Sequence, residues 1–136
     1  MPRFTNSLLV LTLATMISLT AADIPAPAST VIGVDALVAN PKAHAGKVEI
    51  TGVVARVFPK TSSFVLIDAK EYAACGSLTC AEVTLPIQTP TGSFTGDLPQ
   101  VKDTVVVIGE VTPLEKGLNV SVVSVKRGET VLRQRK

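Results

Sequence analysis

Residues 48–57, Val-Glu-Ile-Thr-Gly-Val-Val-Ala-Arg-Val, decide the fold of this chain. The stretch begins with apolar side chains at alternate positions, as in Val48 and Ile50, which is the two-residue repeat of a β-strand. From 53 to 57 the apolar residues fall in the opposite phase. Such a strand buries different faces in its two halves, and a bulge or sharp bend near Gly52 would permit the change.

Further strand-like runs lie on the C-terminal side, at residues 64–67, 81–88, 103–111 and 120–125. The stretch 89–100 contains two prolines and two glycines, so we expect it to be a loop. On the N-terminal side, residues 34–39 have the apolar spacing of a short helix, and Asn40-Pro41 ends it. Five strands and one helical segment are therefore predicted.

A bent first strand, a three-stranded meander and a final hairpin fit an all-β fold, a five-stranded OB-like Greek-key barrel preceded by a short N-terminal helical segment. The motifs are Asp35-Ala-Leu-Val-Ala-Asn-Pro41, Ala45-Gly-Lys-Val-Glu-Ile-Thr-Gly-Val-Val54 and Val105-Val-Val-Ile-Gly-Glu-Val111. In these motifs the chain resembles the small exported bacterial OB-fold proteins of largely unassigned function. The resemblance spans residues 34–125 and implies a fold, without implying an activity.

The N-terminus has the order of a secretory signal peptide: Arg3, an apolar stretch over residues 8–19, and the small residues Thr20-Ala21-Ala22. The apolar stretch is shorter than the roughly 20 residues that cross a bilayer, which disfavours the alternative of a retained membrane anchor. We expect residues 1–22 to be removed, the mature protein to be periplasmic or secreted, and no transmembrane segment to remain.

The rest of the chain divides into a linker, a domain and a tail. Residues 23–33 are rich in Pro, Ala and Ser and are predicted to be a linker; residues 34–126 form the OB-like domain. Residues 127–136 are expected to be a solvated basic tail. The whole chain of 136 residues carries a formal charge of only +2, which disfavours a general polyanion binder.

The chain has two cysteines, in Cys75-Gly-Ser-Leu-Thr-Cys80. Four residues separate them, whereas thioredoxin-like redox motifs have two residues between their cysteines. No histidine follows Cys80, so the motif for covalent haem attachment is also absent. Export favours a structural disulfide. An exchangeable thiol pair and a metal site remain as alternatives, and the metal site would need the single histidine, His44, with a carboxylate or water as fourth ligand.

No motif in the sequence names a reaction, a catalytic residue or a cofactor. We therefore predict a non-catalytic binding module for an unidentified protein, glycan or small ligand, of undetermined oligomeric state. A thiol-redox or metal-handling protein that uses Cys75 and Cys80 is the alternative. Binding of nucleic acid or oligosaccharide on the barrel face ranks lower, because aromatic residues are few and acidic residues offset the basic ones. The predicted binding surface is the loop between the second and third expected strands, which the cysteines hold, together with the neighbouring barrel face. Its residues are Phe58, Lys60, Tyr72, Leu78 and Glu82.

Overall fold

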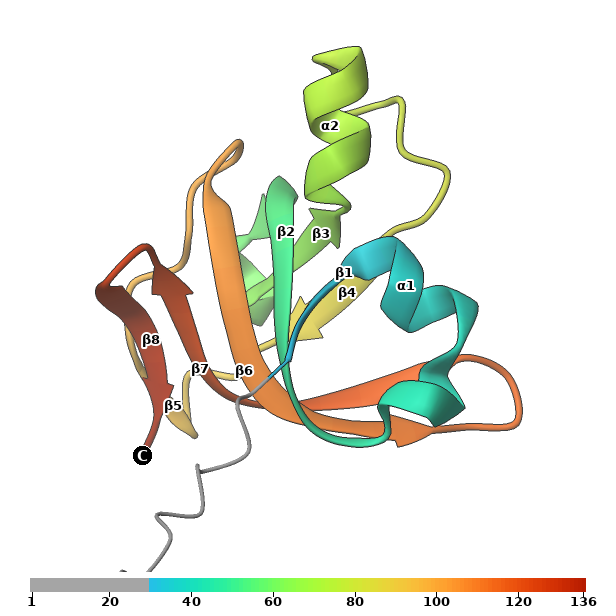
Figure 1. The fold of residues 1–136 in the computed structure, drawn as a ribbon. Helices are drawn as coiled ribbons and strands as arrows, with labels where there is room; N and C mark the ends of the chain where they lie inside the picture. The colour runs from blue at the N-terminus through green and yellow to red at the C-terminus, as the bar shows by residue number, and fades with distance from the viewer. Residues whose placement is uncertain (1–29) are drawn as a thin grey trace, which may run out of the picture.

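The structure, a computed structural model, describes residues 30–136. The predicted signal peptide and residues 23–29 of the predicted linker lie outside the described residues. One curled sheet runs in the order β4-β3-β2-β6-β7-β8-β5, with β1 paired to β2 (Figure 1). The strands are β1 (Val31–Gly33), β2 (Gly46–Phe58), β3 (Ser63–Ile67), β4 (Leu85–Gln88), β5 (Phe94–Gly96), β6 (Thr104–Pro113), β7 (Leu118–Arg127) and β8 (Thr130–Arg135).

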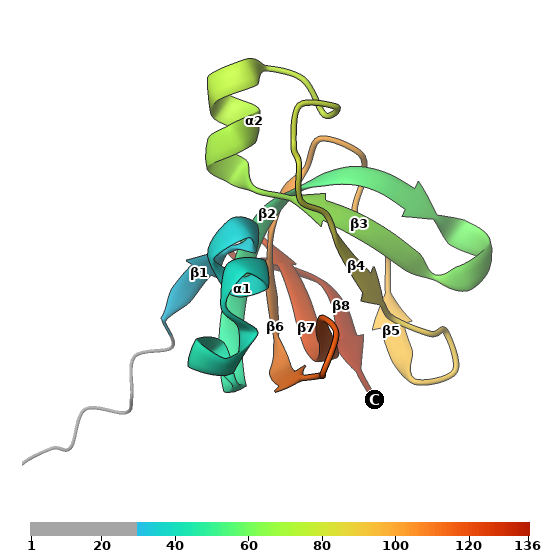
Figure 2. The same ribbon diagram turned by 90° about the vertical axis from the view of Figure 1, so that its right-hand side faces the viewer.

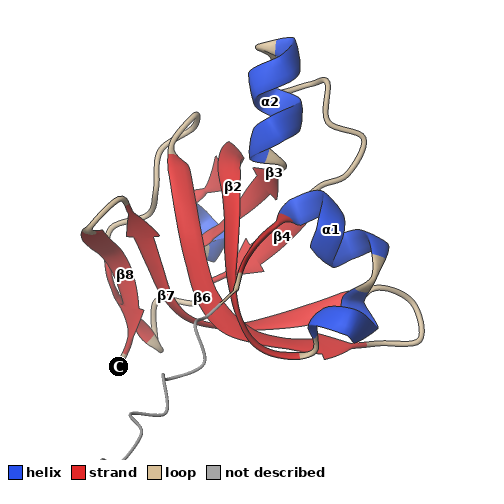
Figure 3. Cartoon of the chain, viewed as in Figure 1, coloured by secondary structure: helices blue, strands red, loops and turns tan. Residues whose placement is uncertain are grey.

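Helices form a small part of the described chain (Figure 3). They are α1 (Val34–Ala39) and α2 (Ala69–Cys75), with the 3₁₀ turns η1 (Pro41–His44) and η2 (Pro59–Thr61). The predicted helix over 34–39 is thus confirmed, and the proline of Asn40-Pro41 begins η1. None of the described helices is long and apolar enough to span a membrane.

Strand β2 is the centre of the sheet. Its first half pairs with β6 from Gly46 to Val53, and its second half pairs with β3 from Val53 to Phe58. The register against β3 shifts between Val54 and Arg56, so the predicted irregularity exists but lies just beyond Gly52. Gly52 instead marks a close approach, because a Cβ there would lie 2.9 Å from the Ile67 carbonyl oxygen.

The core fills the concave side of the curled sheet. Ile50, Phe64 and Val107 from three strands are fully buried there. Helix α1 packs onto the same core through Val34 and Leu37, which are also fully buried. The helical segment therefore closes the barrel core, and its burial explains why a helix of only six residues is stable.

The strand count of five was wrong, since the structure has eight strands, although the prediction of a mostly β fold is confirmed. The five expected strands correspond to β2, β3, β4, β6 and β7. Strand β1 lies in the expected linker, β5 in the expected loop, and β8 in the expected tail. The third expected strand, at 81–88, begins only at Leu85.

The C-terminal residues are part of the sheet because a tight turn returns the chain onto β7. Arg127 pairs with Thr130 across Gly128 and Glu129, and Gly128 has a positive φ of 59°. A two-residue turn with a glycine at positive φ is the usual hairpin connection. The prediction of a solvated tail at 127–136 relied on basic composition alone and was wrong, because most of these residues form β8.

Helix α2 was not predicted, although its ends carry ordinary capping signals. The Asp68 carboxylate accepts a hydrogen bond from the Lys70 backbone N–H at 2.8 Å. At the other end Gly76 takes a left-handed conformation and its N–H donates to the Tyr72 carbonyl at 2.7 Å. Aspartate before a helix and glycine after it are typical caps.

Replacing Gly52 with alanine tests the close approach of β2 and β3. We expect the free energy of unfolding in urea to fall by about 1–3 kcal/mol, because backbone and packed side chains surround the new methyl group. Gly92→Ala is the matched control, since a Cβ there meets nothing within 4 Å. Equal stability of the Gly52→Ala variant and the parent would contradict this account.

Candidate functional site

A groove of about 560 Å³ lies where β2 and β3 meet the loop between α2 and β4. Phe58 and Leu78, both predicted as binding residues, line it. The remaining lining residues are Ala55, Arg56, Val65, Ile67, Thr79, Ala81 and Thr84. We call this the loop groove.

The other three predicted binding residues do not line the loop groove. Lys60 is exposed in η2, Tyr72 is half-buried on α2, and Glu82 is exposed in the segment before β4. The sequence-based site is therefore assembled only in part.

Arg56 was left out of the predicted set and is the one charged residue of the loop groove. Residues two apart on a strand share a face, so Arg56 and Phe58 lie on the same side of β2. That spacing is the signal that could have found Arg56. Phe58 is 44% exposed, which leaves its ring available for contact.

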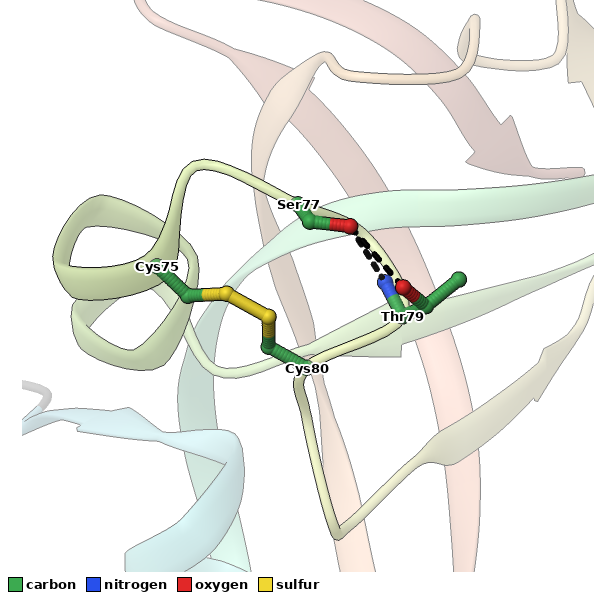
Figure 4. Close-up of a disulfide and its surroundings, with 4 residues drawn as sticks. All are labelled: Cys75, Ser77, Thr79 and Cys80. Atoms are coloured by element: carbon green, nitrogen blue, oxygen red, sulfur yellow. Dashed lines mark hydrogen bonds between the residues drawn. A yellow bond between two sulfur atoms is a disulfide. The ribbon is translucent and has the colours of Figure 1, made fainter.

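The loop that carries Leu78 is closed by Cys75 and Cys80 (Figure 4). Their sulfur atoms lie at bonding distance and their Cα atoms are 6.4 Å apart, within the range of disulfides. Inside the loop, the Ser77 and Thr79 hydroxyls lie 2.9 Å apart, and the Thr79 N–H donates to Ser77 Oγ. A bridge over so short a loop stabilises by about 2 kcal/mol in the chain-entropy model, so its main effect is to restrain the groove wall.

Asp68, at the end of β3, joins both helices to the sheet. Its Oδ1 caps α2, and its Oδ2 accepts a hydrogen bond from the Asp35 N–H in the first turn of α1 at 3.2 Å. Gly33, the residue before α1, has no side chain that could cap the helix, and a Cβ there would lie 2.5 Å from Asp68 Oδ2. Asp68 is only 5% exposed, and its carboxylate accepts hydrogen bonds from the first turns of both helices.

Two more carboxylates lie beside Asp68. Asp35 Oδ1 and Glu71 Oε2 are both inaccessible to solvent. Desolvation raises the pKa of the Glu71 carboxyl most, and the charge of Asp35, a side-chain hydrogen bond with Asp35 and the charge of Asp68 raise it further. This cluster links α1 and α2, so its protonation affects the base of the helix that leads into the loop.

The metal alternative gains no support from this geometry. Among residues 30–136, no group of three or more His, Cys, Asp and Glu side chains is arranged to hold a metal ion. His44 lies in η1, which packs near β6. The cysteines and the acidic cluster are therefore separate features.

Comparisons with family models, with curated proteins and with solved structures each gave no match. The chemistry of the site therefore has to be argued from its own side chains. The loop groove offers apolar surface, two threonine hydroxyls and one guanidinium. This lining suits binding by contact and hydrogen bonding, and it supplies no base or acid that titrates near neutral pH.

Glu71→Gln tests the acidic cluster through its pH dependence. A raised pKa means that the folded state binds the Glu71 proton more tightly than the unfolded state, so this stabilisation is present at low pH. It is lost as pH rises from the ordinary value of 4.5 through the raised pKa. The variant should therefore gain stability relative to the parent on going from about pH 4 to about pH 8, measured by urea unfolding.

Glu110→Gln is the control, because Glu110 is exposed on β6 and lies outside the acidic cluster. Its stability difference from the parent should change less with pH than that of Glu71→Gln. Identical pH dependence in the parent and Glu71→Gln would rule out the account.

Proposed function

We propose that this protein is an exported, non-catalytic binding module built on an OB-like barrel. The connectivity supports the barrel: β2, β3 and β4 form a meander, and the β6–β7 hairpin returns to pair with β2. Strands β1, β5 and β8 would then be additions to the five-stranded plan. The predicted signal peptide and the paired cysteines support export.

The loop groove is the binding face of this proposal. The observation that carries it is the placement of Phe58, Leu78 and Arg56 around one hollow whose wall is held by the Cys75–Cys80 bridge. OB-folds commonly bind ligands at the face of their second and third strands, and β3 contributes to this groove. A restrained wall lowers the ordering cost of binding.

The lining of the loop groove favours an apolar segment of a protein partner over nucleic acid or glycan, which bind by stacking on aromatic side chains. Only one aromatic ring, that of Phe58, lines the loop groove, and Arg56 supplies its only charge. Single-stranded nucleic acid needs successive stacking rings and several cations, and glycans also use aromatic platforms. A glycan or small ligand remains the second choice and nucleic acid the last.

Leu78→Ala should weaken capture of the partner by about tenfold, because it removes apolar contact at the groove wall. The thermal midpoint should stay nearly unchanged, since Leu78 lies outside the buried core. Capture is measured by cross-linking the purified protein in periplasmic extract of the producing cells. Leu114→Ala is the control, because Leu114 is 51% exposed and lies elsewhere, on the β6–β7 connection.

The alternative function is thiol–disulfide exchange by Cys75 and Cys80. The observation in its favour is exposure, because both cysteines are exposed and an attacking thiolate could reach them. The proposal of a binding module instead treats the bridge as a support for the loop.

A redox titration in glutathione buffers separates the two functions. A structural bridge should have a potential below about −300 mV and stay oxidised, whereas an exchanging pair should titrate near about −200 mV. We expect the former. Free thiols in protein taken directly from its native compartment, together with a potential near the higher value, would favour exchange and overturn the structural role.

A further inference from the structure

Strand β4 lies near β7 and β5 without pairing with either, which leaves an open seam in the sheet (Figure 2). A second groove, of about 430 Å³, is lined at this seam by residues of β4, β5, β7 and β8. Its floor is apolar: Leu85, Phe94 and Val122 line it and are each at most 4% exposed. Polar groups of Gln88, Ser121 and Arg135 lie around the floor. We call this the seam groove.

The seam groove carries positive charge. The exposed guanidinium of Arg135 lies over the Phe94 ring, 5.5 Å from its centroid, and its Nη2 donates to Ser121 Oγ at 3.3 Å. A guanidinium has five N–H donors, so most donors of Arg135 are free of hydrogen bonds to the described residues.

A second cation lies next to the same ring. Arg133 is 4% exposed and its guanidinium carbon is 5.9 Å from the Phe94 centroid. Its nitrogens donate to Thr89 Oγ1 at 2.8 Å, to the Thr89 carbonyl at 2.8 Å and to the Gly96 carbonyl at 2.6 Å. Each of its three nitrogens thus donates one hydrogen bond, but all three acceptors are neutral and do not compensate its charge.

Among the described residues, neither guanidinium forms an ion pair with a carboxylate. In the described part of the chain, the one ion pair within 4.0 Å joins Arg127 to Asp103, and no Asp or Glu lines the seam groove. Two cations next to one ring in a partly desolvated site attract an anion more strongly than surface charges in bulk water do. The charge therefore favours an anionic ligand, and the floor favours an apolar body attached to it.

The form of the groove favours a small molecule over an added β-strand. Strand β4 pairs only with β3 among the described strands, and Pro86 lies in the middle of it on the wall of the groove. Proline has no N–H to offer a new strand and typically protects a sheet edge. The volume also lies within the range of small-molecule sites.

We propose that the seam groove binds a small amphipathic carboxylate. Arg135 holds the carboxylate, Arg133 adds a fixed positive field, and Leu85, Phe94 and Val122 contact the apolar body. This site is separate from the loop groove, with which it shares no lining residue. It adds a ligand class to the protein and does not depend on a protein partner at the loop groove.

Isothermal titration with octanoate, octanamide and acetate tests the proposal. Octanoate should bind with saturation at one site, octanamide about tenfold more weakly because it lacks the charge, and acetate without saturation because it lacks the apolar body. Arg135→Gln should weaken octanoate binding about tenfold. In this variant the affinities for octanoate and octanamide should differ little, because the partner of the carboxylate is gone. Arg135→Lys, which keeps the charge, should restore part of the affinity.

Two controls locate the site. Arg127→Gln removes another exposed arginine of the same sheet, which is paired with Asp103, and should leave octanoate binding unchanged. Leu78→Ala alters only the loop groove and should also leave it unchanged. Absence of saturable octanoate binding, equal binding of octanamide, or an equal loss in Arg127→Gln or Leu78→Ala would overturn the proposal. Circular dichroism of each variant separates loss of binding from loss of fold.

Discussion

The structure depends on the pairing of β2 with three strands. Its residues 46–53 pair with β6 on one edge, so β1, which also pairs with residues 49–51, must occupy the opposite edge. Beyond Val53 that opposite edge passes to β3, and the register shift between Val54 and Arg56 accompanies the change of partner. A strand that exchanges partners along its length bends the sheet. The bend brings β4 toward β7 without pairing them and leaves the seam groove between their edges.

Asp68 performs a comparable role for the helical part. Its two carboxylate oxygens accept hydrogen bonds from the first turns of α1 and α2, and a cap of this kind contributes about 1 kcal/mol. Helix α2 then directs the chain into the bridged loop that forms one wall of the loop groove. Desolvation and the charges of Asp35 and Asp68 raise the pKa of the Glu71 carboxyl, so this junction responds to the protonation of Glu71.

The two grooves differ in chemistry because different parts of the chain build them. The loop groove is formed by the neighbouring strands β2 and β3 and by the segment between α2 and β4, with one guanidinium at its side. The seam groove is formed by β4, β5, β7 and β8, whose residues are far apart in sequence, and its charge comes from the C-terminal strand. A protein segment at the first and a small anion at the second would make the module responsive to two ligands.

Local sequence patterns were enough to predict the β-rich character, the short helix at 34–39 and the irregularity of the first long strand, and they favoured a disulfide between the two cysteines of one loop. These features depend on local alternation, capping and spacing. The three-residue strands β1 and β5 could be found only in the tertiary structure, because they are too short to show a two-residue repeat. They form because each pairs with the edge of a neighbouring strand, β1 with β2 and β5 with β8. The tertiary structure also decided that Arg133 is buried, since its acceptors on Thr89 and Gly96 are 44 and 37 residues away in the chain. A charged residue is stable inside only when distant backbone and hydroxyl groups replace its water, and no local pattern records that.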